Sequence, residues 1–316
     1  MMDLQRAESW PALPTDAWAP TRHTLHMVSQ MVGKVRLALA PPQPEWLHAC
    51  LFLDARGLTT GAMPYRDSVV TVSIDLFDPA LVIEVSDGRR AVVAIDVSGS
   101  VAVIWAAYRA ALAGLAIDVD VWGHPQELEG PTPFARDTTV RDFVAEDARR
   151  FHQVLCAVDG AFEVFRSSFF GRTGIQFWWG SFDMSVLLFS GRRSKAPDDR
   201  GYIIRYDLDA ENLSAGFWPG DDDTPEPRLF AYIHPAPPGC EVAPIRPASA
   251  TWAEAMGEWV LPYDEIRSLA DPQAAIVEFL RSVYHVAITN GGWDGDAFAY
   301  DPPPAPRRLA SDPDPA

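Results

Sequence analysis

The sequence has little cysteine and no long apolar run. Its 316 residues include three cysteines and no Cys-x-x-Cys pair, which argues against a disulfide framework and against a cysteine-type zinc site. No stretch of about 18 apolar residues occurs, so we expect no membrane-spanning helix and no membrane partner. The first residues are polar and mixed in charge, unlike a signal peptide. A cytoplasmic location is the expectation that follows.

Two common catalytic motifs are also missing. Gly-x-Ser-x-Gly does not occur, which excludes the nucleophile elbow of a serine hydrolase. No glycine-rich loop joins a strand to a helix, so the usual phosphate-binding loops are not predicted. Cys50 lies in an apolar run and Cys156 in a helical one, positions typical of core packing rather than of nucleophiles. The sequence therefore names neither a reaction nor a cofactor, and it leaves open whether the protein is an enzyme.

Positive charge is scarce and unevenly placed. The chain carries 26 Lys+Arg against 43 Asp+Glu, a net charge of −17. Two windows have the opposite sign: residues 17–44 sum to +3, and residues 164–197 sum to +4 with Asp183 as their one acid. A basic patch in an acidic protein attracts small anions, while the outer surface repels polyanions. A small anionic partner is therefore expected, and nucleic acid is not.

Hydrophobic periodicity predicts an α+β protein. Apolar residues at three- and four-residue spacing predict helices at residues 21–39, 101–115, 142–170 and 272–289, with Thr21 and Asp271 as N-caps of the first and last. Short apolar or alternating runs predict strands at residues 47–54, 68–77, 81–85, 91–95, 117–122, 175–180, 184–189, 202–206, 213–217 and 229–234. We expect two similar lobes (1–135 and 136–298), each with a long helix, a mainly antiparallel sheet and a closing helix. A Pro-rich tail at 299–316 is expected to be disordered.

Several segments resemble an uncharacterised bacterial family, catalogued as domain of unknown function 5996. They are WPALP near the start, TRHTLHMVSQMVGKVRLALAPP at 21–42, ARGLTTGAMPY at 55–65, FWWGSFDMSVLLFSGRR at 177–193, GFWPG at 216–220 and LPYDEIRSLADPQAAIVEFLRSVY at 261–284. The resemblance covers the chain to about residue 293 and implies no activity. Where the family has an Asn-His-Trp-Trp-His run, this chain reads Pro44-Glu45-Trp46-Leu47-His48. A metal-ligand role for the replaced histidine is therefore not carried over.

Histidines and acids give two weak metal patterns. His23 and His26 share a helix face, and His48 follows that helix, but no carboxylate lies nearby in the sequence to complete a site. Helix-face histidines that bond to a neighbouring lobe or to water are the simpler interpretation, and no metal site is predicted. The Asp221-Asp222-Asp223 run lies in a Gly/Pro loop and is typical of solvated surface, with a weak divalent-ion site as the alternative.

Three cations near the first helix are candidates for holding an anion. Lys34, Arg36 and Arg56 can bind a carboxylate or a phosphate, and Arg36 falls on the apolar stripe, where a guanidinium needs an acid or an anionic ligand. A structural ion pair with the other lobe is an equal alternative. Residues 56–61 can hold an anion or form a simple turn, and the turn is favoured.

The run from Phe177 to Asp183 is the most aromatic part of the chain. On a strand both of its faces are aromatic, which fits either a central strand between two layers or a cleft lined by Trp178 and Trp179, with Asp183 and Arg192 at the mouth. One hypothesis is a binder of, or an enzyme acting on, a small anionic ligand in a basic, aromatic cleft between the lobes, with His26 as the best proton carrier. The alternative is a non-enzymatic interaction or structural protein whose basic and aromatic windows are core and lobe interface. The oligomeric state is not predicted.

Overall fold

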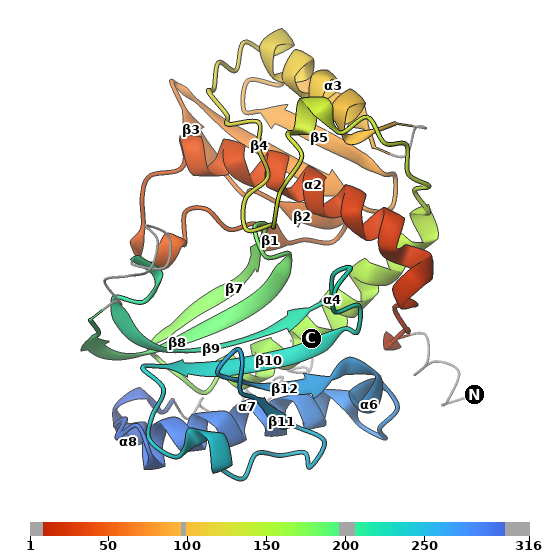
Figure 1. The fold of residues 1–316 in the computed structure, drawn as a ribbon. Helices are drawn as coiled ribbons and strands as arrows, with labels where there is room; N and C mark the ends of the chain where they lie inside the picture. The colour runs from red at the N-terminus through yellow and green to blue at the C-terminus, as the bar shows by residue number, and fades with distance from the viewer. Residues whose placement is uncertain (1–8, 96–98, 196–205, 301–316) are drawn as a thin grey trace, which may run out of the picture.

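The first lobe combines a long buried helix with an antiparallel sheet. The computed structural model describes residues 9–95, 99–195 and 206–300. Helix α2 (Thr15–Leu39) precedes strands β1 (Phe52–Leu53), β2 (Gly57–Thr59), β3 (Met63–Tyr65), β4 (Ser68–Asp75), β5 (Ala80–Val85) and β6 (Arg90–Ala94), and helix α3 (Val101–Gly114) closes the lobe. The strand order is β1-β2-β4-β5-β6, with β3 beside β4. Figure 1 shows this lobe in red to yellow, above the second lobe.

The second lobe repeats the same order of elements. Helix α4 (Ala145–Arg166) leads to strands β7 (Arg172–Trp178), β8 (Asp183–Arg193), β9 (Ala210–Trp218), β10 (Arg228–His234), β11 (Thr251–Ala253) and β12 (Glu258–Pro262), then to helices α6 (Tyr263–Arg267), α7 (Pro272–Thr289) and α8 (Gly295–Phe298). The sheet is antiparallel in the order β11-β12-β10-β9-β8-β7. The predicted α+β class with two similar lobes is thus confirmed. The predicted lobe boundary stays a prediction, and most of the predicted tail lies outside the described residues.

Helix α2 begins earlier than predicted. It starts at Thr15, so Thr21 is not its N-cap; the Thr21 hydroxyl instead accepts a hydrogen bond from the backbone N–H of Val144 at 2.9 Å. Proline lacks the N–H that an α-helix uses, yet the helix continues through Pro20. The reason is packing upstream, because Trp18 is fully buried and its ring lies 5.2 Å from that of Phe151. Burial of one large side chain overrides a local helix breaker here.

The strand predictions fail where alternating burial occurs without strand pairing, or strand pairing without a clear sequence pattern. Ile117, Val119 and Val121 are buried in alternation, but residues 117–122 join no ladder, so the predicted strand is wrong. Residues 57–59, predicted as part of a turn or anion loop, pair with β4 as β2. Strands β3, β11 and β12 were not predicted, and the strand expected at 202–206 lies almost entirely outside the described residues. The last helix agrees with prediction: α7 begins at Pro272, and the Asp271 side chain accepts from the Ala274 N–H at 2.9 Å.

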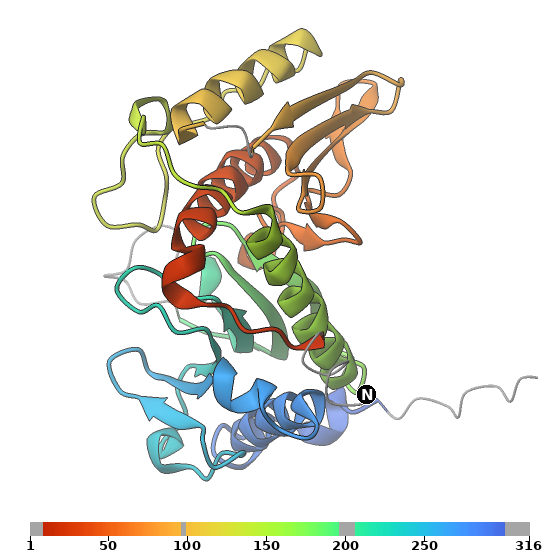
Figure 2. The same ribbon diagram turned by 90° about the vertical axis from the view of Figure 1, so that its right-hand side faces the viewer.

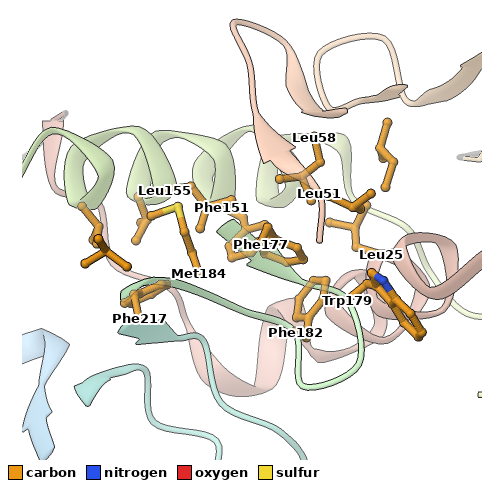
Figure 3. Close-up of a cluster of buried hydrophobic side chains, with 14 of the residues drawn as sticks. Leu25, Leu51, Leu58, Phe151, Leu155, Phe177, Trp179, Phe182, Met184 and Phe217 are labelled. Atoms are coloured by element: carbon orange, nitrogen blue, oxygen red, sulfur yellow. The ribbon is translucent and has the colours of Figure 1, made fainter. Parts of the chain in front are cut away.

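Helix α4 is the structural link between the lobes. In Figure 2 it runs from beside the first lobe down to α7. Its Phe151 ring stacks 5.4 Å from Phe182, which in turn makes an edge contact at 5.3 Å with Phe177 (Figure 3). These rings come from α4, β7 and the turn after β7, so one aromatic core fixes the position of that turn.

The outer strand of the second sheet is fastened to the first lobe. Strand β7 is the last strand in its sheet, so the central-strand interpretation of the aromatic run is wrong. Leu51 and Phe177 exchange two backbone hydrogen bonds of 2.8 Å across the lobe boundary. The Trp179 indole N–H donates to the Ala49 carbonyl at 2.7 Å. The two lobes are therefore joined next to the Trp178–Asp183 turn.

Candidate functional site

The second sheet has one apolar face and one polar, aromatic face. Side chains alternate between the two faces of a strand, and the register places Met184 opposite Phe217 and Ser185 opposite Gly216. Residues in phase with Met184 form the buried core. Residues in phase with Ser185 line a hollow on the other face, and those that bear on its chemistry are Trp178, Asp183, Ser185, Ser214, Phe230 and Tyr232. The polar positions inside these strands are thus the floor of a site.

This hollow, the interlobe cavity, has a volume of about 920 Å³. Its other walls are residues 42–46, 48 and 49 after α2, Gln126 and Glu127 of the connection after α3, and Tyr206, Asp207 and Asp209. The volume falls in the range of small-molecule sites, which hold a ligand between apolar walls and a few polar groups. The cavity lies where the first lobe's α2–β1 connection covers the second sheet.

The charged side chains of the interlobe cavity are mostly acids. Five carboxylates line it: Glu45, Glu127, Asp183, Asp207 and Asp209. Arg193 is the one Lys or Arg among the described lining residues, and it pairs with Asp209 at 3.0 Å. Burial lowers the pKa of His48, which favours its neutral form. The cavity therefore has more negative than positive groups.

Crowding and burial hold two of these acids back from ionising. Burial raises the pKa of Asp183 to about 7, against a hydrogen bond from the Ser181 hydroxyl that lowers it, and neighbouring Glu127 and Glu258 raise it further. Burial, with Glu127 and Glu45 nearby, raises the pKa of Asp207 to about 6. Carboxyls with such pKa values gain strongly from a bound positive charge.

Aromatic rings complete the walls and are held in place. The Trp178 indole N–H donates to the Ser185 hydroxyl at 2.7 Å. The Trp179 ring lies against α2 at Gly33, where a Cβ atom would be 2.0 Å from the indole Cδ1. Phe230 similarly crosses Gly216, where a Cβ would be 2.4 Å from its ring. Two glycines thus make room for two rings of the site.

Backbone strain concentrates around the site. Six described non-glycine residues have positive φ. Four of them line the interlobe cavity or a second cavity that adjoins it: Glu45 (49°), Trp46 (56°), Glu127 (59°) and Phe182 (62°). Such conformations cost roughly 1–3 kcal/mol each and gather at functional sites. The strain supports this region, rather than the distant sheet faces, as the functional one.

A second cavity, the turn-side cavity, lies across the Gly180–Asp183 turn. Its volume is about 680 Å³, and it shares Glu127, Gly180, Ser181, Asp183 and Phe230 with the interlobe cavity. His26 lines it and donates its Nε2–H to the Gly180 carbonyl at 2.8 Å. Burial lowers the pKa of His26 to about 4, so this ring is neutral at neutral pH. In that state it positions the turn.

The predicted cations of α2 do not line either cavity. Lys34 donates to the Gln126 side chain at 2.6 Å and lies 5.2 Å from the ring centres of Trp122 and of Trp179. The Arg36 guanidinium donates to the Thr60 carbonyl and lies over the Phe52 ring at 4.9 Å. Both side chains are buried in the joint of the first lobe, where they contact neutral oxygens and π faces and make no ion pair with a described acid, and the Arg36 Nε has no hydrogen-bond partner among the described residues.

The other two predicted cations are occupied by acids. Arg56 pairs on the surface with Asp75 and, at 2.7 Å, with Asp78. Arg192 pairs with Glu211 at 2.6 Å, and its guanidinium also donates to the carbonyls of Gly291 and Gly292 just after α7. The structure therefore does not bring Lys34, Arg36, Arg56 and Arg192 together, because each contacts its own local partners.

The aromatic half of the predicted site does converge. Trp178, Trp179 and Asp183 line the interlobe cavity, and His26 lines the adjoining turn-side cavity. Glu45, Asp207, Tyr232 and Glu258 were not predicted. Ser185, Ser214 and Tyr232, one in each of β8, β9 and β10 and all on the same face, were the available sign of a polar sheet face. Glu45 and Asp207 come from connections, whose placement no periodicity indicates.

The described residues show neither a metal cluster nor a membrane span. Within residues 9–95, 99–195 and 206–300, no group of three or more His, Cys, Asp or Glu side chains is placed to hold a metal ion. His23 lies 3.3 Å from Asp137 and does not join His26 and His48 in one site. No helix in this part of the chain is long and apolar enough to cross a bilayer.

Comparisons with known proteins give a family and no activity. A family described as "Family of unknown function (DUF5996)" matches residues 10–300. No curated protein and no solved structure matches the chain. Because the match spans both lobes and both cavities, the chain belongs to this family of unknown function.

Proposed function

We propose that the interlobe cavity binds a small organic cation, a molecule that joins an ammonium or guanidinium group to an apolar body. One observation carries the proposal: two carboxylates that line the cavity, Glu45 and Asp183, are only 7% and 6% exposed, and no described Lys or Arg pairs with either. Buried charges in proteins are normally paired. A cationic ligand is the missing partner that this arrangement fits.

The walls suit the apolar part of such a ligand. Trp178, Phe230 and Tyr232 present rings above a floor of small residues, Ser185 and Ser214. Aromatic faces attract cations and pack well against aliphatic or flat groups. A charged head beside the carboxylates and a body against the rings use both kinds of wall.

The proposal keeps the predicted small molecule and changes its charge. The sequence favoured an anion because bases cluster in residues 17–44 and 164–197. An anion in this cavity would face Glu45, Glu127, Asp183 and Asp207, with Arg193 already engaged by Asp209. The lining thus favours a cation over the predicted anion.

Calorimetric titration with a matched pair of probes tests this function. A phenylalkylamine and the phenylalkanoate of the same length differ mainly in the sign of their charge. At about pH 8 the amine should bind and the acid should not, and amine affinity should fall at about pH 5, where Asp183 and Asp207 take up protons.

Two variants control the experiment. Asp183→Asn should weaken amine binding at least roughly tenfold, whereas Asp120→Asn, an exposed acid outside both cavities, should not. Tight binding of the carboxylate in place of the amine would restore the anionic prediction. Binding of neither probe would contradict the proposal and favour an interaction or structural protein.

A further inference from the structure

The turn-side cavity contains its own buried, unpaired carboxylate. Glu258 on β12 is 8% exposed and lines this cavity. Among the described residues, none donates a hydrogen bond to its carboxylate or forms an ion pair with it. Arg228 is the nearby cation, but its guanidinium lies 5.1 Å from the Trp218 ring centre, and its Nε donates to the Glu226 carbonyl at 3.4 Å. Glu258 therefore faces the cavity without a partner.

The remaining cations of this cavity are neutralised locally. Arg22 pairs with Asp222 at 2.6 Å. Arg141 pairs with Asp137 at 3.0 Å, and His23 lies 3.3 Å from the same carboxylate. These pairs leave Glu258 and the shared Asp183 as buried acids that make no ion pair with an arginine of the described chain, with Arg228 as the charged neighbour of Glu258.

The two cavities place such acids on both sides of one turn. Glu45 lies in the interlobe cavity, Glu258 lies in the turn-side cavity, and Asp183 belongs to both linings. Apolar side chains line the same cavities as the acids: Phe230 is shared, and Phe182, Met27 and Met256 belong to the turn-side cavity. Because Glu45 lines only the interlobe cavity and Glu258 only the turn-side cavity, a compact monocation in one cavity contacts only one of these two acids.

We infer that the ligand is a linear dication or polycation with methylene spacers, of the aliphatic polyamine class, and that the turn-side cavity is the subsite for its second cationic group. This inference rests on the proposed cation-binding function and extends it across the turn. One ammonium group lies with Glu45 and Asp183, the other with Glu258, and the methylene chain packs on Phe230 and the neighbouring apolar side chains.

Comparison of monoamines with diamines tests the second subsite in the full-length protein. Titrations use unbranched α,ω-diamines from propane to dodecane and, for each, the monoamine of equal carbon number. We expect an optimum chain length at which the diamine binds at least roughly tenfold tighter than its monoamine. Affinity that rises smoothly with carbon number, equally for both series, overturns the inference.

The variant Glu258→Gln links the effect to this residue. It should bind the optimal diamine no more tightly than the matched monoamine, while Glu226→Gln, an exposed acid outside both linings, should keep the full diamine preference. Circular dichroism confirms that each variant is folded. Monoamine binding without any diamine preference in the wild type refutes only this inference. Failure of both series to bind refutes the proposed function as well.

Discussion

Asp183 is a residue whose placement opposes stability. It begins β8, faces both cavities and is buried, yet its oxygen receives a hydrogen bond only from the Ser181 hydroxyl among described side chains. Ionising a carboxyl there costs free energy that no cation repays within the described chain. Residues of this kind are retained for function, and removing their charge stabilises the empty protein.

The Asp183→Asn variant should therefore be more stable than the wild type at about pH 8. The folded pKa of about 7 lies above the value of 3.8 for an unperturbed aspartate. Between these values the folded protein holds a proton that the unfolded chain has released, so the free energy of unfolding falls as the pH rises through this window. The variant lacks that fall, which corresponds to about 4 kcal/mol over the whole window at 1.36 kcal/mol per pKa unit.

Urea unfolding at about pH 5 and about pH 8 measures this difference. The wild type should lose stability between the two values, and the variant should lose less. Glu258 has a pKa raised to about 7 in the same way, so the wild-type slope is shared and Glu258→Gln should remove another part of it. A variant that is equally destabilised at both pH values would show that Asp183 is a structural residue.

Gly33 and Gly160 give a second contrast at the level of single residues. Both lie inside long helices, where alanine is intrinsically better by about 1 kcal/mol. At Gly33 a Cβ would meet the Trp179 ring at 2.0 Å, whereas at Gly160 the nearest atom is 3.8 Å away. We expect Gly33→Ala to destabilise by roughly 1–3 kcal/mol and to weaken amine binding by displacing Trp179.

Gly160→Ala should instead be neutral or stabilising and leave binding unchanged. Thermal denaturation measures the stability of Gly33→Ala and Gly160→Ala, and indole fluorescence should change only in Gly33→Ala, since only that variant displaces a tryptophan. Equal stability of the two variants would mean that Trp179 is not held against α2.

At the scale of elements, adjacent residues of strand β8 belong to the site and to the core, because they point to opposite faces of the sheet. Ser185 faces the interlobe cavity and accepts a hydrogen bond from Trp178, while Val186 is fully buried on the opposite face. Ser185→Ala should weaken amine binding by freeing the Trp178 ring, and it should lower the free energy of unfolding by about 1 kcal/mol or less. Val186→Ala should cost about 2 kcal/mol by leaving a cavity in the core and retain binding.

Calorimetric titration and urea unfolding of both variants test this division. The prediction is a crossed result, in which each variant mainly affects one measurement. If Val186→Ala lost binding at a temperature where it is fully folded, the ligand would depend on the opposite face of the sheet, and the proposed location of the site would be contradicted.

Elements were predictable where local periodicity and burial agree. Helix α7 and its cap at Asp271 follow from sequence spacing alone, and the β4–β5 hairpin follows from alternation and its turn. Residues 117–122 show the limit, because Ile117 and Val119 are buried without a pairing strand. Strand pairing depends on neighbours distant in the sequence, and no pattern within the segment reports it.

The candidate site was predictable only in its aromatic part, because its charged side chains also depend on neighbours distant in the sequence. Trp178 and Trp179 stand out as an unusual run, and they do line the cavity. The charges could not be placed, since a basic window in the sequence does not say what its side chains contact. Lys34 and Arg36 are buried against oxygens and rings of the joint, whereas Glu45 and Glu258 approach the two cavities from segments far apart in the chain.

At the scale of the whole molecule, net charge and cavity charge have the same sign. The chain carries −17, and the interlobe cavity is lined by five carboxylates against one paired arginine. A potential of one sign that increases toward a cleft speeds the arrival of oppositely charged ligands. Among the bases of residues 17–44, Lys34 lies behind the cavity wall, where it bonds to Gln126 and partly offsets this field, whereas Arg36 bonds to Thr60 outside the lining.

Association of an amine ligand should therefore slow as salt is added. Raising the ionic strength from about 0.01 M to about 0.15 M shortens the Debye length from about 30 Å to about 8 Å, which screens distant surface acids and leaves the buried ones. Stopped-flow fluorescence of Trp178 and Trp179 should show an association rate reduced roughly tenfold and a dissociation rate changed much less. An uncharged amide of the same shape should bind weakly, with a rate that salt does not alter. Equal salt dependence of both rates for the amine would locate its charge at the exposed surface rather than beside Asp183, and would contradict binding in the cavity.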